Sequence, residues 1–206
     1  MSRGKRNKGW IKEHRRDPFV RSAKRAGYRS RAAYKLIQLD ERERIFRPGQ
    51  VVVDLGAAPG GWSQVAADRV GQAGRVLALD LLAMDPLPGV AFMQGDFLDP
   101  ALVAALRREL EGMRADVVMS DMAPNISGVR DADQARGLEL ALAALEFGEA
   151  LIKPTGTFLV KAFQGARIDE LVSSVKQSFG SVVIRKPGAS RDKSSEVYLL
   201  ARDYGV

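Results

Sequence analysis

One segment constrains the fold more than any other: an apolar strand that runs directly into a glycine-rich turn and then into a helix. Residues 51–56 read VVVDLG, a run too continuously apolar and β-branched for a strand with one exposed face. The turn that follows reads AAPGGW, and a helix is predicted from Ser63 to Val70. Strands buried on both faces are typical of parallel sheets, so the segment predicts an α/β fold with a ligand-binding turn at the carboxyl end of a central strand.

The same alternation of strand and helix continues along the chain. We expect further strands at residues 75–80, 90–93, 115–121, 157–163, 181–186 and 196–201. We expect helices from Ser30 to the Pro48-Gly49 break and over residues 100–111, 133–152 and 168–178, with Pro154 and Gly156 separating the long helix from the next strand. The pattern predicts a Rossmann-like, mostly parallel seven-stranded sheet that ends in an antiparallel hairpin and has one antiparallel edge strand.

Charge divides the chain into two parts. Residues 1–35 contain 13 Lys and Arg against 2 acidic residues, whereas the remaining residues contain 19 against 23. We therefore expect a basic, partly flexible arm over residues 1–30, flexible through residue 20, and one folded domain over residues 31–206. Basic arms commonly neutralise nucleic-acid phosphates, although a solvated tail is the better explanation of the arm taken alone.

Composition excludes several classes of protein. Hydrophobic residues make up 46% of the chain, which is enough for a core. The absence of cysteine excludes disulfides and thiolate metal sites. No apolar run is long enough for a membrane span, and no apolar stretch follows the basic N-terminus as it would in a secretory signal. We expect a cytoplasmic protein, in which the lone histidine, His14, is a solvated residue of the arm.

The glycine-rich turn and two later acidic residues form a candidate nucleotide site. Gly60 lies in the turn, Asp80 ends the second predicted strand and Asp96 follows the third. Ligands of open α/β sheets bind at the carboxyl ends of the strands. We expect Asp80 to accept hydrogen bonds from a ribose and Asp96 to accept from an adenine amino group.

The residues alone leave more than one ligand for this site. A dinucleotide site prefers a middle glycine where this chain has Ala58, and the alanine hinders close approach of a pyrophosphate. Asp54, directly before the turn, favours a cationic ligand such as S-adenosylmethionine, which carries a sulfonium and an amine but no phosphate. A tight turn without any ligand is the third alternative, and the acidic residues at two later strand ends weaken it.

Three further charged residues lie at predicted strand ends and could converge. Asp121 ends the fourth strand, Lys161 ends the otherwise apolar fifth strand, and Glu196 opens the last strand. Each has an ordinary explanation: a turn cap for Asp121, a snorkelling side chain for Lys161 and a surface ion pair for Glu196. A lysine among buried strand residues nevertheless calls for a carboxylate partner, and Asp121 and Glu196 are the candidates.

These residues stand in segments that resemble the FtsJ-type ribosomal RNA large subunit methyltransferases over nearly the whole chain. The similar segments are Arg29-Ser30-Arg31-Ala32 with Lys35, VVDLGAAPGGWSQ (52–64), LALDLLAMDP (77–86), QGDF (94–97), VVMSDMAPN (117–125), VKAFQG (160–165), RKP (185–187) and SSEVY (194–198). The resemblance implies a class I methyltransferase fold and a catalytic tetrad at Lys35, Asp121, Lys161 and Glu196. It also implies cofactor contacts at Gly60, Trp62, Asp80, Asp96 and Asp121.

The function implied by the resemblance is transfer of a methyl group from S-adenosylmethionine to the ribose 2′-hydroxyl of a uridine in 23S RNA of the large ribosomal subunit, by a monomer and without a metal. A ribose hydroxyl is a poor nucleophile, so a base must take its proton, and Lys161 is the candidate unless it only orients the hydroxyl. Transfer RNA or a messenger RNA cap is an alternative substrate. A dinucleotide-dependent oxidoreductase is disfavoured by Asp54 and Ala58, and a non-catalytic RNA-binding module is disfavoured by the intact tetrad.

Overall fold

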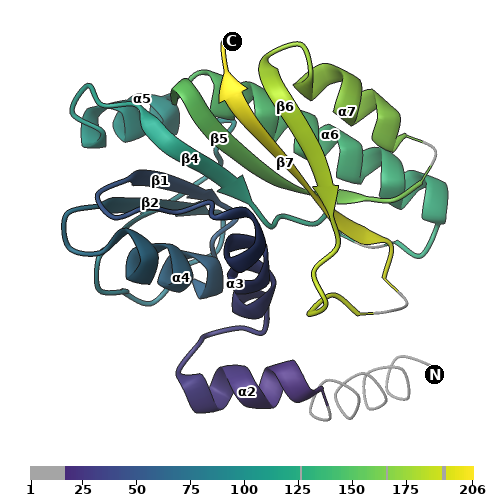
Figure 1. Cartoon of the computed structure of the whole chain (residues 1–206), viewed down its shortest axis with the longest axis horizontal. Helices are drawn as coiled ribbons and strands as arrows, with labels where there is room; N and C mark the ends of the chain where they lie inside the picture. Colours follow the sequence, from purple (N-terminus) through teal and green to yellow (C-terminus); the bar gives the residue numbers. More distant parts are fainter. Residues whose placement is uncertain (1–16, 126, 166, 192–193) are drawn as a thin grey trace.

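The structure of the chain is a computed structural model, which describes residues 17–125, 127–165, 167–191 and 194–206. Helices and strands alternate along these residues (Figure 1). In chain order the elements are α2 (Pro18–Ala26), α3 (Ala32–Glu43), β1 (Val51–Leu55), α4 (Gly61–Val70), β2 (Arg75–Asp80), β3 (Val90–Gln94), α5 (Pro100–Glu109), β4 (Ala115–Ser120), α6 (Arg130–Glu149), β5 (Ile152–Phe163), α7 (Ile168–Val175), β6 (Phe179–Arg185) and β7 (Glu196–Tyr204).

The strands form one seven-stranded sheet in the order β3-β2-β1-β4-β5-β7-β6. β1 pairs in parallel with β2 and β4, β2 pairs in parallel with β3, and β4 pairs in parallel with β5. β7 runs antiparallel to both of its neighbours, β5 and β6. The predicted fold class, a Rossmann-like α/β fold with a mostly parallel seven-stranded sheet, is confirmed.

The expected hairpin is present at the sheet edge, but its reversed strand is not the outermost one. β6 lies at the edge, and β7 lies between β6 and β5. The connection from β5 through α7 to β6 skips one position in the sheet, and β7 returns to fill it. A helical crossover joins strands that run in the same direction. The edge strand β6 therefore points the same way as β5, and the antiparallel strand is internal.

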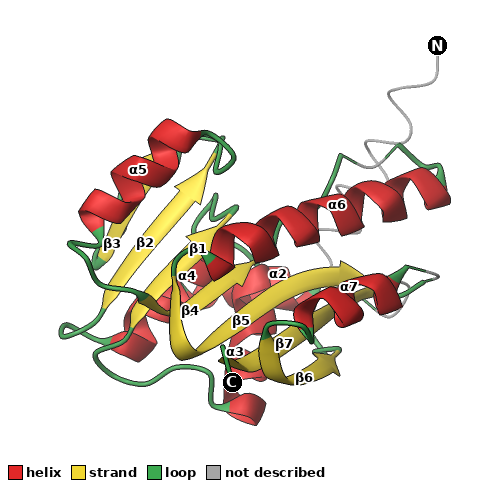
Figure 2. Cartoon of the chain, turned by 90° about the horizontal axis from the view of Figure 1, so that it is seen from above, coloured by secondary structure: helices red, strands yellow, loops and turns green. Residues whose placement is uncertain are grey.

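Helices cover both faces of the sheet (Figure 2). α5, α6 and α7 pack on one face, whereas α3 and α4 pack on the other. Because successive strand residues point to opposite faces, Val53 of β1 belongs to the core under the first group of helices and Val52 to the core under the second. Of the helices that the structure describes, none combines the length and the apolar composition that a bilayer crossing requires.

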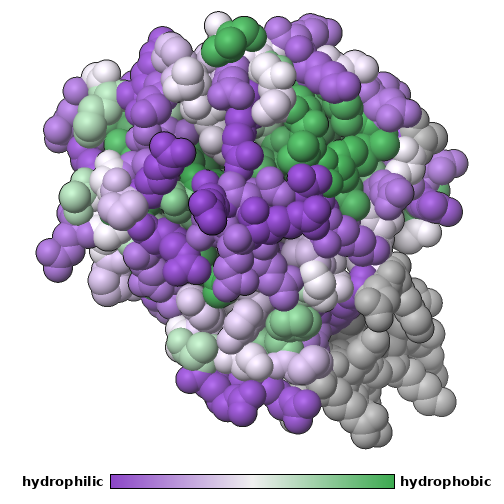
Figure 3. Space-filling model, viewed as in Figure 1, coloured by the Kyte–Doolittle hydropathy of each residue, from purple (hydrophilic) through white to green (hydrophobic). Residues whose placement is uncertain are grey.

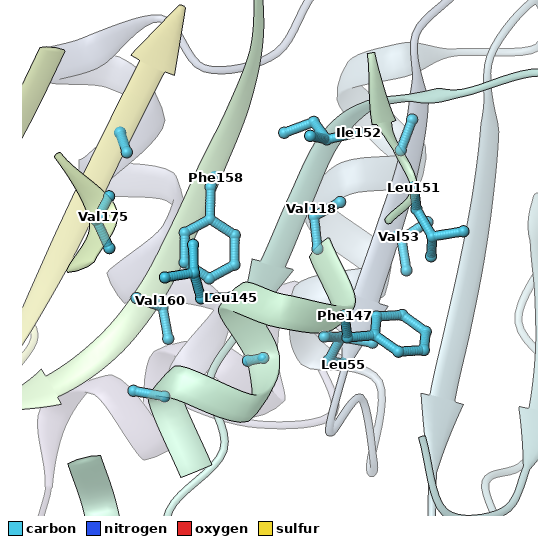
Figure 4. Packing of buried hydrophobic residues seen from close by; sticks show 14 of the residues in the cluster. Val53, Leu55, Val118, Leu145, Phe147, Leu151, Ile152, Phe158, Val160 and Val175 are labelled. Carbon is cyan, nitrogen blue, oxygen red and sulfur yellow. The ribbon is translucent and has the colours of Figure 1, made fainter. Parts of the chain in front are cut away.

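The larger of the two cores lies between the sheet and α6. Figure 4 shows Phe147 of α6 beside Leu55 of β1, and Leu145 of α6 beside Phe158 and Val160 of β5. All five side chains are at most 7% exposed, which is the burial that apolar packing needs to stabilise the fold. This packing holds β1, β4 and β5 in place, and the ends of these strands carry the candidate site.

The boundary between the long helix and the fifth strand differs from the prediction. α6 spans Arg130–Glu149 rather than residues 133–152, and β5 already begins at Ile152. Pro154 and Gly156 lie inside β5, where the pairing with β4 is irregular and shifts register. Proline is tolerated in a strand where the ladder of hydrogen bonds is interrupted, so these two residues do not separate the elements as expected.

α2 begins within the segment that the sequence led us to expect as flexible. Residues 1–16 of the predicted arm lie outside the described residues. Asp17 caps α2 by accepting a hydrogen bond from the Phe19 N–H at 2.9 Å, and Gly27 ends the helix in the left-handed conformation at φ 77°. The rings of Phe19 and Tyr34 of α3 lie 5.6 Å apart. α2 therefore leans on α3, away from the sheet (Figure 1).

Candidate active site

Three neighbouring strands end at one edge of the sheet and bring the predicted ligand residues together. In the sheet register, Leu55 at the end of β1 lies between Leu79 of β2 and Ser120 of β4. The glycine-rich turn, Asp80 and Asp121 follow these three residues directly in the chain. The strand order therefore gives the turn a carboxylate on each side.

The glycine-rich turn packs tightly against its surroundings. Gly60 has a left-handed backbone, φ 106°, and a Cβ there would lie 2.6 Å from the Cδ1 of Leu87. A Cβ on Gly61, the first residue of α4, would collide with the Oγ of Ser30. Both positions require glycine because a side chain has no room. The absence of side chains at these two positions lets Leu87 and Ser30 pack directly against the main chain of the turn and the start of α4.

Arg29 ties this turn to a second loop. Its guanidinium donates to the carbonyl oxygens of Pro59 at 3.2 Å, Asp85 at 2.6 Å and Pro86 at 2.8 Å. Pro59 belongs to the glycine-rich turn, and the other two residues belong to the loop that follows β2. A single side chain from the segment between α2 and α3 thus holds the two loops that flank the sheet edge.

Main-chain donors hold the two carboxylates expected to bind the nucleoside. One oxygen of Asp80 accepts from the Ala58 N–H and the other from the Leu82 N–H, both at 2.8 Å. Asp96, which is exposed in the loop after β3, accepts from the Leu98 N–H at 2.9 Å. A carboxylate oxygen has more than one lone pair, so both groups keep acceptor capacity for ligand hydroxyls or amines.

Asp54 is a buried carboxylate in β1, directly before the turn. It is 1% exposed, and its Oδ2 accepts from the Ser63 hydroxyl at 2.6 Å. Its Oδ1 is buried and has no hydrogen-bond partner among the described residues. Burial raises the pKa of Asp54 to about 7, the Ser63 hydrogen bond opposes this rise, and the charges of Asp121 and Asp80 add to it. A cation at this edge of the sheet would stabilise the ionised form.

Trp62 does not offer its side chain to the sheet edge. The residue is 3% exposed, and its Nε1 donates to the carbonyl oxygen of Ala32 at 2.9 Å. Its ring lies 5.6 Å from the ring of Tyr198. The indole is therefore packed between α3 and β7 and is not exposed for the cofactor contact expected of Trp62.

The four residues expected to form a tetrad come together on the face covered by α3. The Nζ of Lys161 lies 2.7 Å from the Oδ1 of Asp121, donates to the Asp121 carbonyl oxygen at 2.7 Å, and lies 3.7 Å from the Oε2 of Glu196. The Nζ of Lys35 lies 2.7 Å from the Oε1 of Glu196. The side chains are 8% to 16% exposed, so these contacts are shielded from bulk water. The result is one chain of alternating charge: Asp121, Lys161, Glu196, Lys35.

The sheet register explains why these residues meet. β5 and β7 are antiparallel neighbours, with Lys161 opposite Tyr198 and Phe163 opposite Glu196. Glu196 and Tyr198 are two residues apart in β7 and share a face of the sheet, as Lys161 does with its cross-strand partner. α3 covers that face, and Lys35 reaches Glu196 from α3.

Glu196 is the anion that pairs with both Lys35 and Lys161. Burial raises its pKa, but the charges of Lys35 and Lys161 outweigh burial, and the pKa of Glu196 lies below its ordinary value. The Ser190 hydroxyl donates to its Oε1 at 3.0 Å and adds to this effect. Glu196 is therefore ionised at neutral pH and holds the two ammonium groups near each other.

Tyr198 is a site residue that the sequence analysis missed. It is fully buried, and its hydroxyl donates to the Oδ1 of Asp121 at 2.7 Å. Burial raises the pKa of Tyr198 well above its ordinary value, and the charge of Asp121 adds to the rise, so the hydroxyl stays protonated and donates. The available signal was alternation in the last strand, which puts Tyr198 on the same face as Glu196.

Two arginines that the sequence analysis did not assign to the site, Arg31 and Arg191, border the tetrad. Arg31, Lys35 and Arg191, together with Ser194 and Glu196, line a pocket that opens to solvent. The sequence analysis named Arg31 only as part of the basic N-terminal region and of a segment similar to the family, and it did not consider Arg191. The centre of this face of the molecule is mainly hydrophilic (Figure 3).

Comparison with known proteins gives consistent similarities. Residues 28–204 match the family of FtsJ-like methyltransferases. A protein of Azoarcus sp. named ribosomal RNA large subunit methyltransferase E is 56% identical over 98% of this chain and 99% of its own length. A protein of the same name from Marinobacter nauticus is 52% identical over 100% of both chains. The crystal structure of a ribosomal RNA methyltransferase from Plasmodium falciparum is similar with a TM-score of 0.79 and 31% identity, over 86% of this chain and 98% of that chain.

Proposed function

The chain belongs to the FtsJ-like methyltransferase family, and on this premise we propose that it transfers a methyl group from S-adenosylmethionine to the ribose 2′-hydroxyl of a uridine in 23S RNA of the large ribosomal subunit. Methyl transfer follows from the family. The methyl donor, the ribose oxygen and the RNA are the proposed part. The observation that carries it is the buried chain of alternating charge from Asp121 to Lys35, beside the glycine-rich turn.

The residues around the turn suit S-adenosylmethionine. Gly60 lies in the turn between these acceptors, Asp80 has acceptor capacity for ribose hydroxyls, and Asp96 has acceptor capacity for an adenine amine. The Oδ1 of Asp54, which has no hydrogen-bond partner among the described residues, favours a ligand with positive charge. When bound, S-adenosylmethionine supplies an electrophilic methyl group on a sulfonium. A pyrophosphate would instead meet the carboxylates of Asp54, Asp80 and Asp121, which argues against a dinucleotide.

Lys161 is the residue that we propose acts on the ribose hydroxyl. The carbonyl and the carboxylate of Asp121 both accept from its Nζ, each at 2.7 Å. An ammonium has no lone pair, so Lys161 must first release one proton to solvent. The neutral amine then has two hydrogens for the two oxygens of Asp121 and a lone pair that takes the hydroxyl proton. Lys35, held by Glu196, supplies a positive charge that stabilises the negative charge developing on the 2′-oxygen.

Two observations support large-subunit ribosomal RNA as the substrate. The relatives from Azoarcus sp. and Marinobacter nauticus carry that substrate in their names and align along essentially the whole chain. The side of the molecule that holds the tetrad also carries Arg21, Lys24 and Arg25 on the exposed surface of α2, which suits RNA phosphates. We place the enzyme in the cytoplasm as a monomer acting on this RNA, within the subunit.

A map of methylation tests the proposal. Large subunits and 23S RNA from cells that lack the protein are incubated with methyl-labelled S-adenosylmethionine and with the wild type, Lys161→Ala or the matched control Lys176→Ala, which changes an exposed lysine after α7. The wild type and the control are expected to label the 2′-oxygen of one 23S uridine, and Lys161→Ala is expected to label none. Label on a base, or only on transfer RNA, would contradict the proposal.

A further inference from the structure

The pocket beside the tetrad contains positively charged side chains that are not part of the tetrad. Its lining includes Arg31, Lys35 and Arg191, together with Ser194 and Glu196. Lys35 and Glu196 therefore belong both to the pocket and to the tetrad. A group bound in the pocket would lie next to the atoms that act on the ribose hydroxyl.

The ion pairs around the pocket leave one cation without a close partner. Lys161 and Lys35 are paired with Asp121 and Glu196, at 2.7 Å in each case. Arg31 forms an ion pair with Asp17. The guanidinium of Arg191 approaches only Asp17, at 3.8 Å, within the part of the chain that the structure describes. The side chain of Arg191 is 42% exposed, so its donors are open to a ligand from solvent.

The backbone that carries Arg191 is built onto the N-terminal segment and α3. Arg31 donates to the carbonyl oxygen of Ala189, and the Ala189 N–H donates to the Oε1 of Gln38 at 2.8 Å. Ala189 itself is fully buried. The Nε of Arg31 is buried without a hydrogen-bond partner among the described residues. These contacts hold the two arginines on one side of the pocket, where like charges accumulate and an anion would be stabilised.

Burial lowers the pKa of Arg31, and the neighbouring charge of Arg191 lowers it further. The two guanidinium groups therefore repel each other. Asp17 offsets part of this repulsion. A singly charged anion between the arginines would offset the rest.

The covalent structure of RNA identifies the anion. The 2′- and 3′-oxygens stand on adjacent ribose carbons, so the phosphate on the 3′ side is the phosphate nearest to a 2′-hydroxyl. The phosphate on the 5′ side is separated from it by the 4′ and 5′ carbons as well. A ribose whose 2′-hydroxyl meets Lys161 thus brings its 3′ phosphodiester, with one negative charge, into the surroundings of Lys35.

We propose that Arg191, supported by Arg31, binds the phosphate on the 3′ side of the methylated nucleotide and so positions its ribose for the tetrad. This inference rests on the proposed function, because it assumes an RNA ribose at Lys161. Arg191 acts by holding the substrate rather than by touching the reacting atoms. Guanidinium groups suit this task because they bind phosphate oxygens with two parallel donors.

The test uses a substrate RNA in which single phosphates are removed. The RNA carrying the uridine that the wild type methylates is assembled from two pieces with a nick directly 3′ of that uridine, which ends in a 3′-phosphate or a 3′-hydroxyl. A matched pair has the nick on the 5′ side, with or without the 5′-phosphate. The proteins are the full-length wild type, Arg191→Gln, Arg191→Lys and the control Arg107→Gln, which changes an exposed arginine on α5 at the other face of the sheet.

We expect removal of the 3′-phosphate to lower the kcat/KM of the wild type by about tenfold to a hundredfold, as for the loss of a charge-assisted hydrogen bond. Arg191→Gln should lower kcat/KM on the phosphorylated RNA by a similar factor and should lose little more when the phosphate is removed, because the two changes delete the same interaction. Arg191→Lys should retain part of the effect as a point charge. Arg107→Gln should behave as the wild type.

Three results would overturn the inference. They are wild-type kinetics for Arg191→Gln, fully multiplicative losses from Arg191→Gln and removal of the 3′-phosphate, and coupling of Arg191 to the 5′-phosphate instead. An unchanged melting temperature in Arg191→Gln separates these results from misfolding. If the wild type leaves no 2′-O-methyl group on the intact RNA, the proposed function fails and this inference fails with it. If the wild type methylates the RNA and Arg191→Gln has the same kcat/KM as the wild type, only the inference fails.

Discussion

At the scale of single residues, Asp121 joins the cofactor side of the site to the catalytic side. It follows β4 at the sheet edge, where the turn that we assign to the methyl donor also lies. Its Oδ1 accepts from the Nζ of Lys161 and from the hydroxyl of Tyr198, each at 2.7 Å. Tyr198 therefore fixes the carboxylate that in turn fixes Lys161. In the proposed reaction we therefore assign the tyrosine hydroxyl a positioning role, exerted through Asp121.

Replacing Tyr198 by phenylalanine isolates this role. The ring that packs 5.6 Å from Trp62 is kept, and only the donor to Asp121 is removed. We expect kcat to fall by about tenfold, in line with the loss of a hydrogen bond to a charged group, while the Kd of S-adenosylmethionine and the melting temperature change little. Steady-state kinetics and calorimetry give these values. An unchanged kcat would show that the Tyr198 hydroxyl does not position Asp121 for the reaction.

We expect Asp54 to make binding of the methyl donor depend on pH. Its pKa is raised to about 7 in the free protein, first by burial, so the carboxyl group is largely protonated below that pH. A cationic ligand favours the ionised form, so binding must release this proton at low pH. Affinity for S-adenosylmethionine should therefore rise by up to about tenfold per pH unit below pH 7 and level off above it.

Titration calorimetry at several pH values measures this dependence, and buffers of different ionisation enthalpy count the released proton. The matched variant is Asp54→Asn, which keeps the size of the side chain and removes its titration. Its affinity should be weaker above pH 7 and nearly independent of pH. A pH-independent affinity in the wild type would show that Asp54 does not respond to the ligand's charge.

At the scale of elements, the segment between α2 and α3 connects the basic N-terminal region to the loops of the cofactor site. Arg29 donates to carbonyl oxygens in both loops, and Ser30 packs against Gly61. Two residues later α3 begins, and it delivers Lys35 to the tetrad. RNA that contacts this segment would therefore lie close to both the methyl-donor loops and the tetrad.

Arg29→Ala tests the connection between these loops. Removing the three hydrogen bonds frees the loop after β2 from the glycine-rich turn, so we expect the Kd of S-adenosylmethionine to rise by about tenfold, the effect of losing a charge-assisted hydrogen bond. Arg29→Lys should recover little, because an ammonium cannot reach three carbonyl oxygens with the geometry of a guanidinium. Calorimetry in the absence of RNA checks both variants. Wild-type affinity in Arg29→Ala would show that the two loops keep their arrangement without the hydrogen bonds of Arg29.

Much of the fold could be predicted from local patterns, because buried parallel strands and intervening helices leave clear signals in the sequence. β1, with all five residues buried, is the clearest case. The position of β7 could not be predicted in this way. Whether the last strand lies outside β6 or between β6 and β5 depends on pairing between segments far apart in the chain. The local pattern of the hairpin is the same in both arrangements.

The candidate site, like the fold, could be predicted only in part from local sequence patterns. Asp80 and Asp121 were predictable because topology gathers strand ends at one edge. Lys35 was named only through the family resemblance, since nothing in its local pattern points toward Glu196. Arg191 was missed because it lies in the connection between β6 and β7, and only the tertiary fold brings that connection to α3.

At the scale of the whole molecule, positive charge is concentrated in the N-terminal part of the chain. The first 35 residues contain 13 Lys and Arg against 2 acidic residues, and the rest of the chain contains 19 against 23. α2 presents Arg21, Lys24 and Arg25 to solvent, and no other described helix has so many basic residues in so few turns. We therefore expect this end to supply most of the salt-dependent binding to RNA, without selecting the target base.

The triple variant Arg21→Gln, Lys24→Gln, Arg25→Gln tests this expectation. Its log–log plot of RNA affinity against salt should become shallower by about 0.7 for each phosphate that α2 no longer neutralises, and the KM for RNA should rise. The control removes the same charge elsewhere, by Arg107→Gln, Arg108→Gln and Lys176→Gln on α5 and after α7. Equal salt slopes in the two variants would show that α2 does not contact RNA phosphates and is an ordinary solvent-exposed helix.

The central claim is that Lys161, held by Asp121 and Glu196, acts on a ribose hydroxyl. The measurement that tests it most directly is the single-turnover rate of 2′-O-methylation at the mapped uridine, for the wild type, Lys161→Ala and Lys161→Arg with bound S-adenosylmethionine. The account predicts a fall of about 10² to 10⁴-fold in Lys161→Ala, the usual range for a general base, and little recovery in Lys161→Arg, because a guanidinium keeps its proton. Wild-type rates in Lys161→Arg would contradict proton abstraction by Lys161, and wild-type rates in Lys161→Ala would contradict the site itself.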